Sequence, residues 1–226
     1  AGIPTFKYPD RAARTFAQLW HDRADLDGLY ETPVPDPGSP EDGAAPDEAG
    51  KIIAAARGAG RTLLTEHESK RILAAYGIPV VETVVALGED AAVAAAERLG
   101  FPVAVKLHSE TITHKTEVNG VQLGVDGAAA VRRAWQAIQQ AVRAKAGEGH
   151  FLGVTVQRMI PPAGCELILG SSIDPQFGPV LLFGAGGQQV EVLRDHALGF
   201  PPVNATLAWR LMERTRVHAV LKGARG

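Results

Sequence analysis

The residues best suited to chemistry lie close together in one stretch, FPVAVKLHSETITHKTEVNGVQLG, at residues 101–124. Lys106 ends a run of apolar residues, and His114 and Lys115 lie in the polar loop that follows it. A lysine ammonium is a point charge suited to phosphate oxygens, and a neutral imidazole is a competent nucleophile. The stretch therefore indicates a site that holds a nucleotide triphosphate and accepts its terminal phosphoryl group.

Each of these residues also has a simpler interpretation. Lys106 can extend into solvent at the end of a strand, and a loop histidine is more often solvated than reactive. Two neighbours favour the chemical interpretation. Lys115 would stabilise a phosphoramidate on the adjacent ring, and Asn119-Gly120 permits a positive φ and a close backbone approach to phosphate. His108, in the same stretch, remains a second candidate for the nucleophile.

A glycine-rich segment, FGAGGQ at residues 183–188, contains Gly184, Gly186 and Gly187 between two predicted strands. It is not a Walker A loop, because no Gly-Lys-Ser/Thr follows it, and it is not a dinucleotide fingerprint, because no helix follows it. Two interpretations remain: a tight turn between strands, or a mobile loop whose backbone amides face phosphates.

Acidic and hinge residues complete the candidates. Glu166 and Glu191 are acids in otherwise apolar strands. A half-buried strand often has one such acid on its solvent-facing side, which is the simpler interpretation of each. If a nucleotide lies between two lobes, Glu166 would reach the ribose or the adenine edge, and Glu191 with Asp195 would line the phosphate end. The remaining candidates follow one another in a strand that would contact adenine through its backbone and through packing of Met159 on the ring: Gln157, Arg158 and Met159.

The elements that must position these residues follow from periodicity and capping signals. Thr65 and Glu68 form a capping box that begins a helix, which Gly77 ends. Further helices are predicted at 5–20, 89–99, 127–146 and from Asn204 to Met212, and strands at 80–87, 101–107, 121–125 and 151–160. After Pro161-Pro162, strands at 165–174, 179–184 and 190–198 are joined by short turns, which favours antiparallel pairing.

Composition limits the classes of protein. The acidic segment 31–50 holds six acids, five prolines and no base, which predicts a disordered linker, whereas the rest shows no basic excess typical of nucleic-acid binding. One cysteine permits no internal disulfide, so we expect a reducing, cytoplasmic location. We expect no membrane span, because there is no apolar run of sufficient length.

The same stretches resemble a known family. LLTEHESKRILAAYGIPV (63–80), residues 101–124 and VTVQRMIPPAGCELILGSSIDPQFGPVLLFGAGGQQVEVLRDHALGFPP (154–202) are similar to the ATP-grasp part of NDP-forming acyl-CoA synthetases, the ADP-forming acetate–CoA ligases. The resemblance implies an α/β fold of the ATP-grasp type, two α+β lobes with a nucleotide cleft between them, truncated at the C-terminus. It covers roughly residues 61–226.

The resemblance also implies domains and site residues. We expect 1–30 to be the tail of a preceding CoA-ligase part, 31–60 the linker, 61–155 an N-terminal lobe and 156–226 an incomplete C-terminal lobe. By position, Lys106 resembles the phosphate lysine and His114 the phosphoryl carrier of the His-Lys loop. Gln157 to Met159 resemble the adenine hinge, Glu166 the acid after it, and Gly184 to Gly187 the glycine turn. Mg²⁺ ligands are expected beyond Gly226.

The implied activity is an ADP-forming acyl-CoA ligase with ATP or ADP and Mg²⁺. In the implied relay, a histidine of the CoA-ligase part takes phosphate from an acyl phosphate, and His114, the second carrier, accepts it and passes it to ADP. The implied partners are CoA-binding and CoA-ligase domains of the same parent chain. Two alternatives stay open. One is a non-catalytic module that senses nucleotide or acyl-CoA in a protein that carries a lysine acetyltransferase. The other is a carboxylate–amine ligase, which would form no phosphohistidine.

Overall fold

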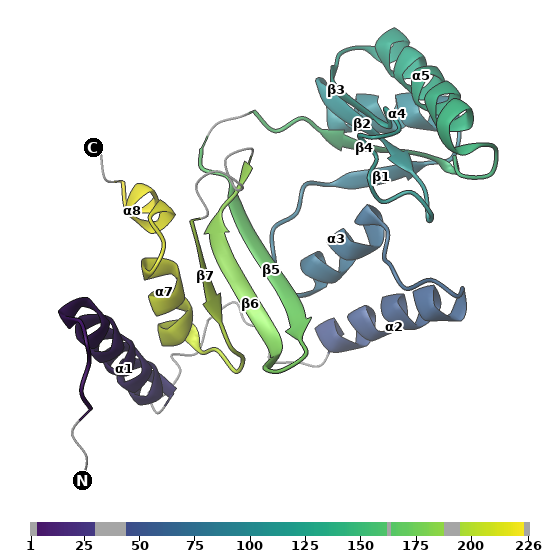
Figure 1. Ribbon diagram of the computed structural model, residues 1–226. Coiled ribbons are helices and arrows are strands. Elements are labelled where there is room, and N and C mark those ends of the chain that lie inside the picture. The colour runs from purple at the N-terminus through teal and green to yellow at the C-terminus, as the bar shows by residue number, and fades with distance from the viewer. Residues whose placement is uncertain (1–3, 30–43, 162–163, 188–194, 224–226) are drawn as a thin grey trace. The chain divides into compact units, whose positions relative to one another are not determined.

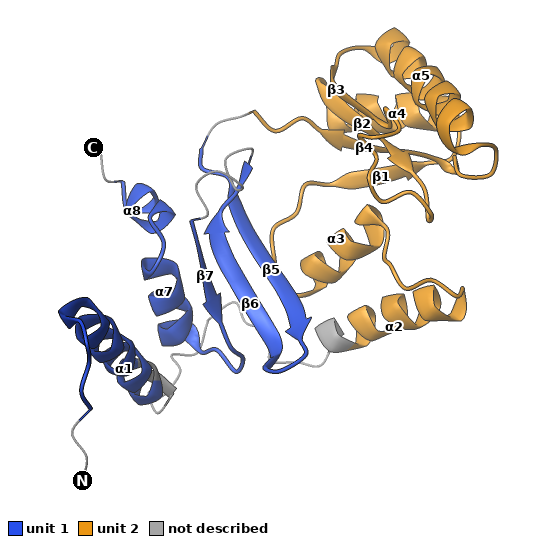
Figure 2. Cartoon of the chain, viewed as in Figure 1, with its two compact units in different colours: residues 1–35, 162–226 blue, residues 36–161 orange. Residues whose placement is uncertain are grey.

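The computed structural model describes residues 4–29, 44–161, 164–187 and 195–223 (Figure 1). The chain divides into two compact units (Figure 2). Unit 1 comprises residues 1–35 and 162–226, and unit 2 comprises residues 36–161. Each unit has a sheet of its own, so the division into two α+β parts that the sequence predicts is present in the structure.

Unit 2 contains a four-stranded antiparallel sheet in the order β1-β4-β2-β3. Its strands are β1 (Thr83–Ala86), β4 (Gly153–Arg158), β2 (Val103–His108) and β3 (Val121–Val125). Its helices are α2 (Ala44–Gly58), α3 (Glu66–Ala75), α4 (Glu89–Leu99) and α5 (Ala128–Ala146). Helices α4 and α5 cover one face of this sheet (Figure 1).

The core of unit 2 lies between this sheet and the two covering helices. Val105 and Leu107 of β2 are fully buried there, together with Ile138 of α5 and Val156 of β4. Successive side chains of a strand point to opposite faces. Because Val105 and Leu107 point toward α4 and α5, Lys106 between them points to the opposite face of the sheet.

That opposite face receives helix α3. The helix begins with the predicted capping box: the Thr65 hydroxyl accepts from the Glu68 amide, and the Glu68 carboxylate accepts from the Thr65 amide. Lys70 donates to Thr83 of β1 and Gln157 of β4, which are paired across the sheet. The first turns of α3 are therefore held over the strand residues that share a face with Lys106.

Helix α2 lies within the segment that the sequence predicts to be a linker. Ala49, Ile52 and Ala56 recur at helical spacing and are buried, and α2 contacts α3. The prediction of a linker through residue 60 is therefore wrong over Ala44–Gly58, because alanine-rich helix formers and one buried stripe outweigh the acidic composition. Residues 30–43 lie outside the described residues.

Unit 1 contains a three-stranded antiparallel sheet, β5-β6-β7, as the short turns between its strands predict. Its strands are β5 (Leu167–Asp174), β6 (Gly178–Ala185) and β7 (His196–Gly199), and its helices are α1 (Pro9–Leu29), α7 (Ala205–Glu213) and α8 (Val217–Leu221). A small core joins Phe183, Ala197, Leu211 and Val217.

Most predicted helices and strands are confirmed to within a few residues, and α4 and β3 have the predicted bounds. The described part of β7 begins at His196, so the start of the strand predicted at 190–198 lies outside the described residues. The sequence analysis missed α2 and α8. Among the described residues, no helix combines the length and the apolar character needed to cross a membrane.

Candidate functional site

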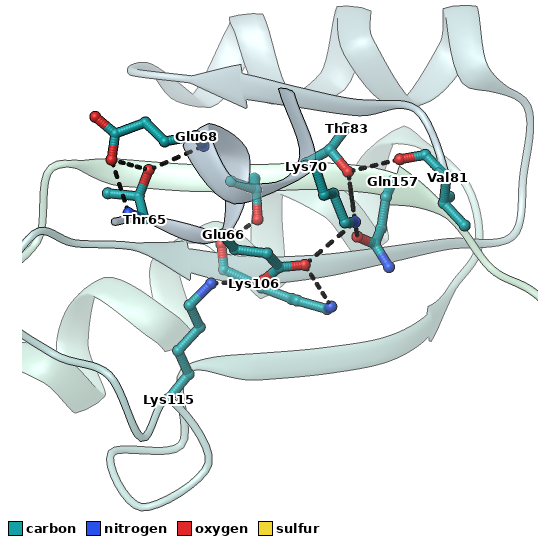
Figure 3. A network of polar contacts seen from close by, with 10 residues as sticks. Thr65, Glu66, Glu68, Lys70, Val81, Thr83, Lys106, Lys115 and Gln157 are labelled. Carbon is teal, nitrogen blue, oxygen red and sulfur yellow. Dashed lines mark hydrogen bonds and ion pairs between the residues drawn. The ribbon is translucent and has the colours of Figure 1, made fainter. Parts of the chain in front are cut away.

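Three lysines of unit 2 surround the carboxylate of Glu66, the first residue of α3 (Figure 3). Nζ of Lys106 lies 2.9 Å from Glu66 Oε1, and Nζ of Lys115 lies 2.7 Å from Glu66 Oε2. Nζ of Lys70, one helical turn after Glu66, lies 3.3 Å from Oε1. We call these three residues the lysine trio. The trio thus brings together α3, β2 and the loop after β2.

The electrostatics of this cluster favour an anion. Burial by itself would raise the pKa of Glu66, but the hydrogen bonds and charges of Lys115 and Lys106 outweigh it and lower this pKa to about 2. Burial lowers the pKa of Lys70 from its ordinary value, against the opposing charge of Glu66. One carboxylate faces three ammonium groups, so the trio carries an excess of positive charge where side chains are only 16–24% exposed.

The loop between β2 and β3 is built by its own hydrogen bonds. The Ser109 hydroxyl accepts from the amides of Thr111 and Ile112 at 3.3 and 3.2 Å. At the other end, the Gly120 amide donates to the Lys115 carbonyl over 2.7 Å. A Cβ at Gly120 would lie 2.9 Å from that carbonyl oxygen, so the turn that this hydrogen bond closes requires glycine. Asn119 has a φ of 54°, which confirms the positive φ expected there.

This loop carries His114 to a pocket of about 490 Å³. Residues 63–66 line it together with Lys106, Ser109, Glu110, residues 112–116 and Val121. His114 is exposed, and it lines this pocket together with Lys106 and Lys115. His108 does not line this pocket; burial, followed by the charge of Lys115, lowers its pKa. Accessibility therefore favours His114 over His108 as the nucleophile.

A second ion-pair group fastens the same loop at its start. Arg61 donates to both carboxylate oxygens of Glu68, at 2.9 and 2.6 Å, and its Nε lies 3.4 Å from Glu110. Hydrogen bonding from Arg61 is the main reason that the pKa of Glu68 falls to about 2. Ion pairs therefore join the His114 loop to the start of α3 at two points, Glu110 and Lys115.

The predicted hinge residues lie at the end of β4. Gln157 accepts from Lys70 over 2.7 Å, so it contacts the lysine trio. The Met159 amide donates to the Pro102 carbonyl over 3.0 Å, which engages that N–H within unit 2. Arg158 is exposed and lines a different hollow, with residues 79–82 and 98–99. The structure therefore brings Gln157, but not Arg158, together with the phosphate candidates; an adenine role for these three residues stays a prediction.

The remaining candidates lie in unit 1. The Gly186 amide donates to the Glu166 carbonyl over 2.7 Å, which brings the glycine turn against the start of β5. A Cβ at Gly184 would lie 2.3 Å from the Asp195 carbonyl oxygen, and one at Gly187, where φ is 75°, would lie 2.3 Å from Glu166 Oε2. Close backbone packing thus accounts for Gly184, and the positive φ accounts for Gly187, without a ligand. A phosphate or ribose role for Gly184, Gly186, Gly187 and Glu166 stays a prediction.

Asp195 and Glu191 are the two acidic candidates that remain. Asp195 accepts from the amides of Arg216 and Val217 at 2.8 and 2.7 Å, so its carboxylate caps α8. Glu191 lies outside the described residues. Within the described ranges, no group of three or more histidine, cysteine or acidic side chains is placed to hold a metal ion. The prediction of Mg²⁺ ligands elsewhere remains untested.

The sequence analysis missed Glu66 and Lys70. Their spacing of four residues puts both on one side of α3, but charged residues at this spacing are common on exposed helix surfaces. The available signal was position, because Glu66 opens the capped helix, where an acid is favoured by the helix dipole. Only the packing of α3 on the sheet shows that this side faces Lys106.

Comparison with known proteins agrees with this geometry. A family model described as ATP-grasp domain matches residues 55–226. The subunit beta of acetate–CoA ligase [ADP-forming] II of Pyrococcus furiosus is 37% identical over 179 residues, which cover 79% of this chain and 75% of that protein. The family model's match includes both the His114 loop and the glycine turn.

Solved structures give the same result. The dinucleotide-forming acetyl-coenzyme A synthetase 1 of Ca. Korarchaeum cryptofilum, in complex with coenzyme A, Ca-AMPCP and HgCl⁺, is 36% identical with a TM-score of 0.72, covering 78% of this chain and 76% of that one. Another structure of that protein, with Mg-AMPPCP and a phosphohistidine segment pointing towards the nucleotide binding site, is 34% identical with a TM-score of 0.65, covering 79% and 76%. The chain belongs to the ATP-grasp family, among the ADP-forming acetate–CoA ligases and their β subunits.

Proposed function

We propose that this chain is the nucleotide-binding part of an ADP-forming acyl-CoA ligase, an acid–thiol ligase in which His114 carries a phosphoryl group between an acyl phosphate and ADP. The observation that carries the proposal is the pocket in which the exposed His114 lies with the ammonium groups of Lys106 and Lys115. The name of the Korarchaeum structure mentions a phosphohistidine segment that points towards the nucleotide binding site, which supports a relay through phosphohistidine in this family.

The phosphoryl step follows from these groups. In the direction of ATP use, an unprotonated ring nitrogen of His114 attacks the γ-phosphorus, and a P–N bond forms as the bond from phosphorus to the β,γ-bridging oxygen breaks. The bridging electron pair leaves with ADP. The transition state spreads negative charge over the transferred oxygens, so nearby cations stabilise it without covalent help. Lys106 and Lys115 supply this charge, and Gln157 holds Lys70 beside them.

The residues that are present fit the phosphate chain, because three ammonium groups already converge on one carboxylate anion. Mg²⁺ is the metal we infer, since the Korarchaeum structure contains Mg-AMPPCP. When bound, such an ion would neutralise phosphate charge. We assign no ligand to it, because the described residues include no suitable cluster.

The ligase also requires groups that activate the carboxylic acid substrate and groups that bind CoA. We infer that a CoA-binding part supplies them, since the Pyrococcus relative is named as a β subunit. In the direction of ATP synthesis, a histidine of that part would take phosphate from the acyl phosphate and pass it to His114. A cytoplasmic location is part of the same proposal. The regulatory alternative is not supported, because the relatives are named as ligases.

A phosphohistidine trap tests the proposal. The purified protein, with its CoA-binding part, is incubated with γ-labelled ATP and Mg²⁺, and acid-labile, base-stable label is counted. We expect label on the wild type and on His108→Gln, and a loss of at least about 100-fold on His114→Ala. His150→Ala serves as a control for another histidine of the same unit, one that is partly exposed and lies outside the pocket lining.

Two results would contradict the proposal. Label retained on His114→Ala would assign the acceptor to another residue, and label lost only from His108→Gln would assign it to the strand histidine. Absence of label from every variant, with transfer of an acyl group to an amine, would favour the carboxylate–amine ligase.

A further inference from the structure

The carboxylate of Glu66 lies where the lysine trio would bind an anionic ligand. Both of its oxygens are engaged: Oε1 by Lys106 and Lys70, and Oε2 by Lys115. Glu66 also lines the pocket that His114 lines. Carboxylate and phosphate oxygens accept hydrogen bonds from the same ammonium donors, so Glu66 and a phosphate group compete for the same partners.

Competition has a physical reason. Without an anion, three ammonium groups close to one another in a partly buried site would repel, and their repulsion would displace the loop that carries Lys115. Glu66 removes that repulsion when no phosphate is bound. When phosphate is bound, the same carboxylate is a like charge next to it and opposes it.

The capped start of helix α3 fixes the backbone position of Glu66. Thr65 and Glu68 lock the first turn of α3, and Lys70 ties its next turn to Thr83 and Gln157 of the sheet. The carboxylate is thus held by an element of unit 2, independently of the flexible ends of Lys106 and Lys115. The two lysine side chains are the parts that change partner.

We propose that Glu66 is a placeholder for phosphate: it positions Lys106 and Lys115 in the empty site and is displaced from them when the phosphate chain of the nucleotide binds. Glu66 therefore weakens nucleotide affinity and allows the nucleotide to exchange. This inference rests on the proposed function, in that it takes the trio as the phosphate site, but it assigns Glu66 a role that does not depend on transfer to His114.

The test is the affinity of the purified protein for ADP and for tripolyphosphate, a probe that has phosphates and no base, measured by calorimetry. For Glu66→Gln we expect binding about tenfold tighter for both ligands, since one opposing charge a few ångströms from the phosphates is removed. Glu117→Gln is the matched control, because Glu117 is an exposed acid of the loop that carries Lys115 but does not line the pocket; we expect its affinities to stay within about twofold.

Several results would overturn the placeholder. Unchanged or weaker binding by Glu66→Gln would show that Glu66 only orients the lysines, and equal tightening by Glu117→Gln would show a general effect of charge. If Glu66→Gln does not fold, Glu66→Asp is tested instead. The shorter side chain of aspartate holds its carboxylate farther from the lysine trio, so we expect both ligands to bind more tightly than to the wild type, by a smaller factor than for Glu66→Gln.

The two proposals fail in different ways. If the wild type binds ADP and Glu66→Gln binds no tighter, the placeholder is wrong and the ligase proposal stands. If Glu66→Gln tightens both ligands but no label reaches His114, the relay is wrong and the placeholder stands. If neither protein binds either ligand, both are wrong.

Discussion

Lys106 and Glu66 are 40 positions apart in the chain, and an ion pair of 2.9 Å joins them in the folded protein. Lys106 is directed by strand alternation in β2, and Glu66 by the capped start of α3. The pair therefore forms where a helix end meets the polar face of a sheet, and it defines the site on which the first three predictions bear.

Removal of the strand lysine should weaken nucleotide binding. We expect Lys106→Gln to lower ADP affinity by about 10- to 100-fold, because a charge-assisted contact to phosphate is lost in a partly buried site. Calorimetry measures the change. Lys51→Gln, at an exposed position of α2, is the charge-matched control. Equal affinities of Lys106→Gln and the wild type would remove Lys106 from the phosphate site.

The depressed pKa of Glu66 predicts a dependence of stability on pH. Its pKa falls from an ordinary value of 4.5 to about 2, so the ionised carboxylate stabilises the fold above pH 4.5, and this contribution is lost as the pH falls toward 2. We expect Glu66→Gln to cost on the order of 2 kcal/mol at pH 7, after allowance for partial exposure, and much less near pH 2.5.

Urea unfolding of the wild type and Glu66→Gln at several pH values measures this difference. Glu68 also has a pKa of about 2, from its pairing with Arg61, so Glu66→Gln should retain part of the acid sensitivity. A stability difference that is the same at pH 7 and pH 2.5 would show that the ion pairs of Glu66 contribute little.

Loss of the helix cap should affect the site through α3. We expect Thr65→Ala to destabilise unit 2 by about 1 kcal/mol, since the amide of Glu68 loses its acceptor. Because α3 carries Glu66 and Lys70, hydrogen exchange of the amides in 66–75 should increase. Thr65→Ser, which keeps the hydroxyl, should restore protection; if it does not, packing of the methyl group rather than capping is the cause.

One glycine of the glycine turn in unit 1, Gly184, is predicted to be required for stable folding. We expect Gly184→Ala to destabilise the β6–β7 pairing by about 1–3 kcal/mol, because the new Cβ would lie 2.3 Å from the Asp195 carbonyl oxygen. Thermal unfolding without nucleotide measures this. Gly170→Ala, where the nearest atom to a new Cβ is 4.0 Å away, is the control. A loss of nucleotide affinity without a loss of stability would instead favour a phosphate role for Gly184.

The sequence by itself determined most local structure. The capping box at Thr65 and Glu68, the alternation around Lys106 and the periodic apolar residues of α5 each depend on neighbours in the chain, and each element is present. The same holds for Asn119, because a positive φ is a property of one residue and its turn. The linker prediction was wrong at α2, whose helix is stabilised by contacts with α3.

Only the tertiary structure decided which charges meet. Glu66, Lys70, Lys106 and Lys115 come from two helical turns, a strand and a loop, and no local rule predicts which side of α3 rests on the sheet. Long-range packing sets that choice, because α3 contacts β1 while its capped end and the ion pairs of Glu66 hold the loop. The chemistry predicted for Lys106 and His114 thus rests on residue types and order, whereas the anion that faces the lysines depended on the fold.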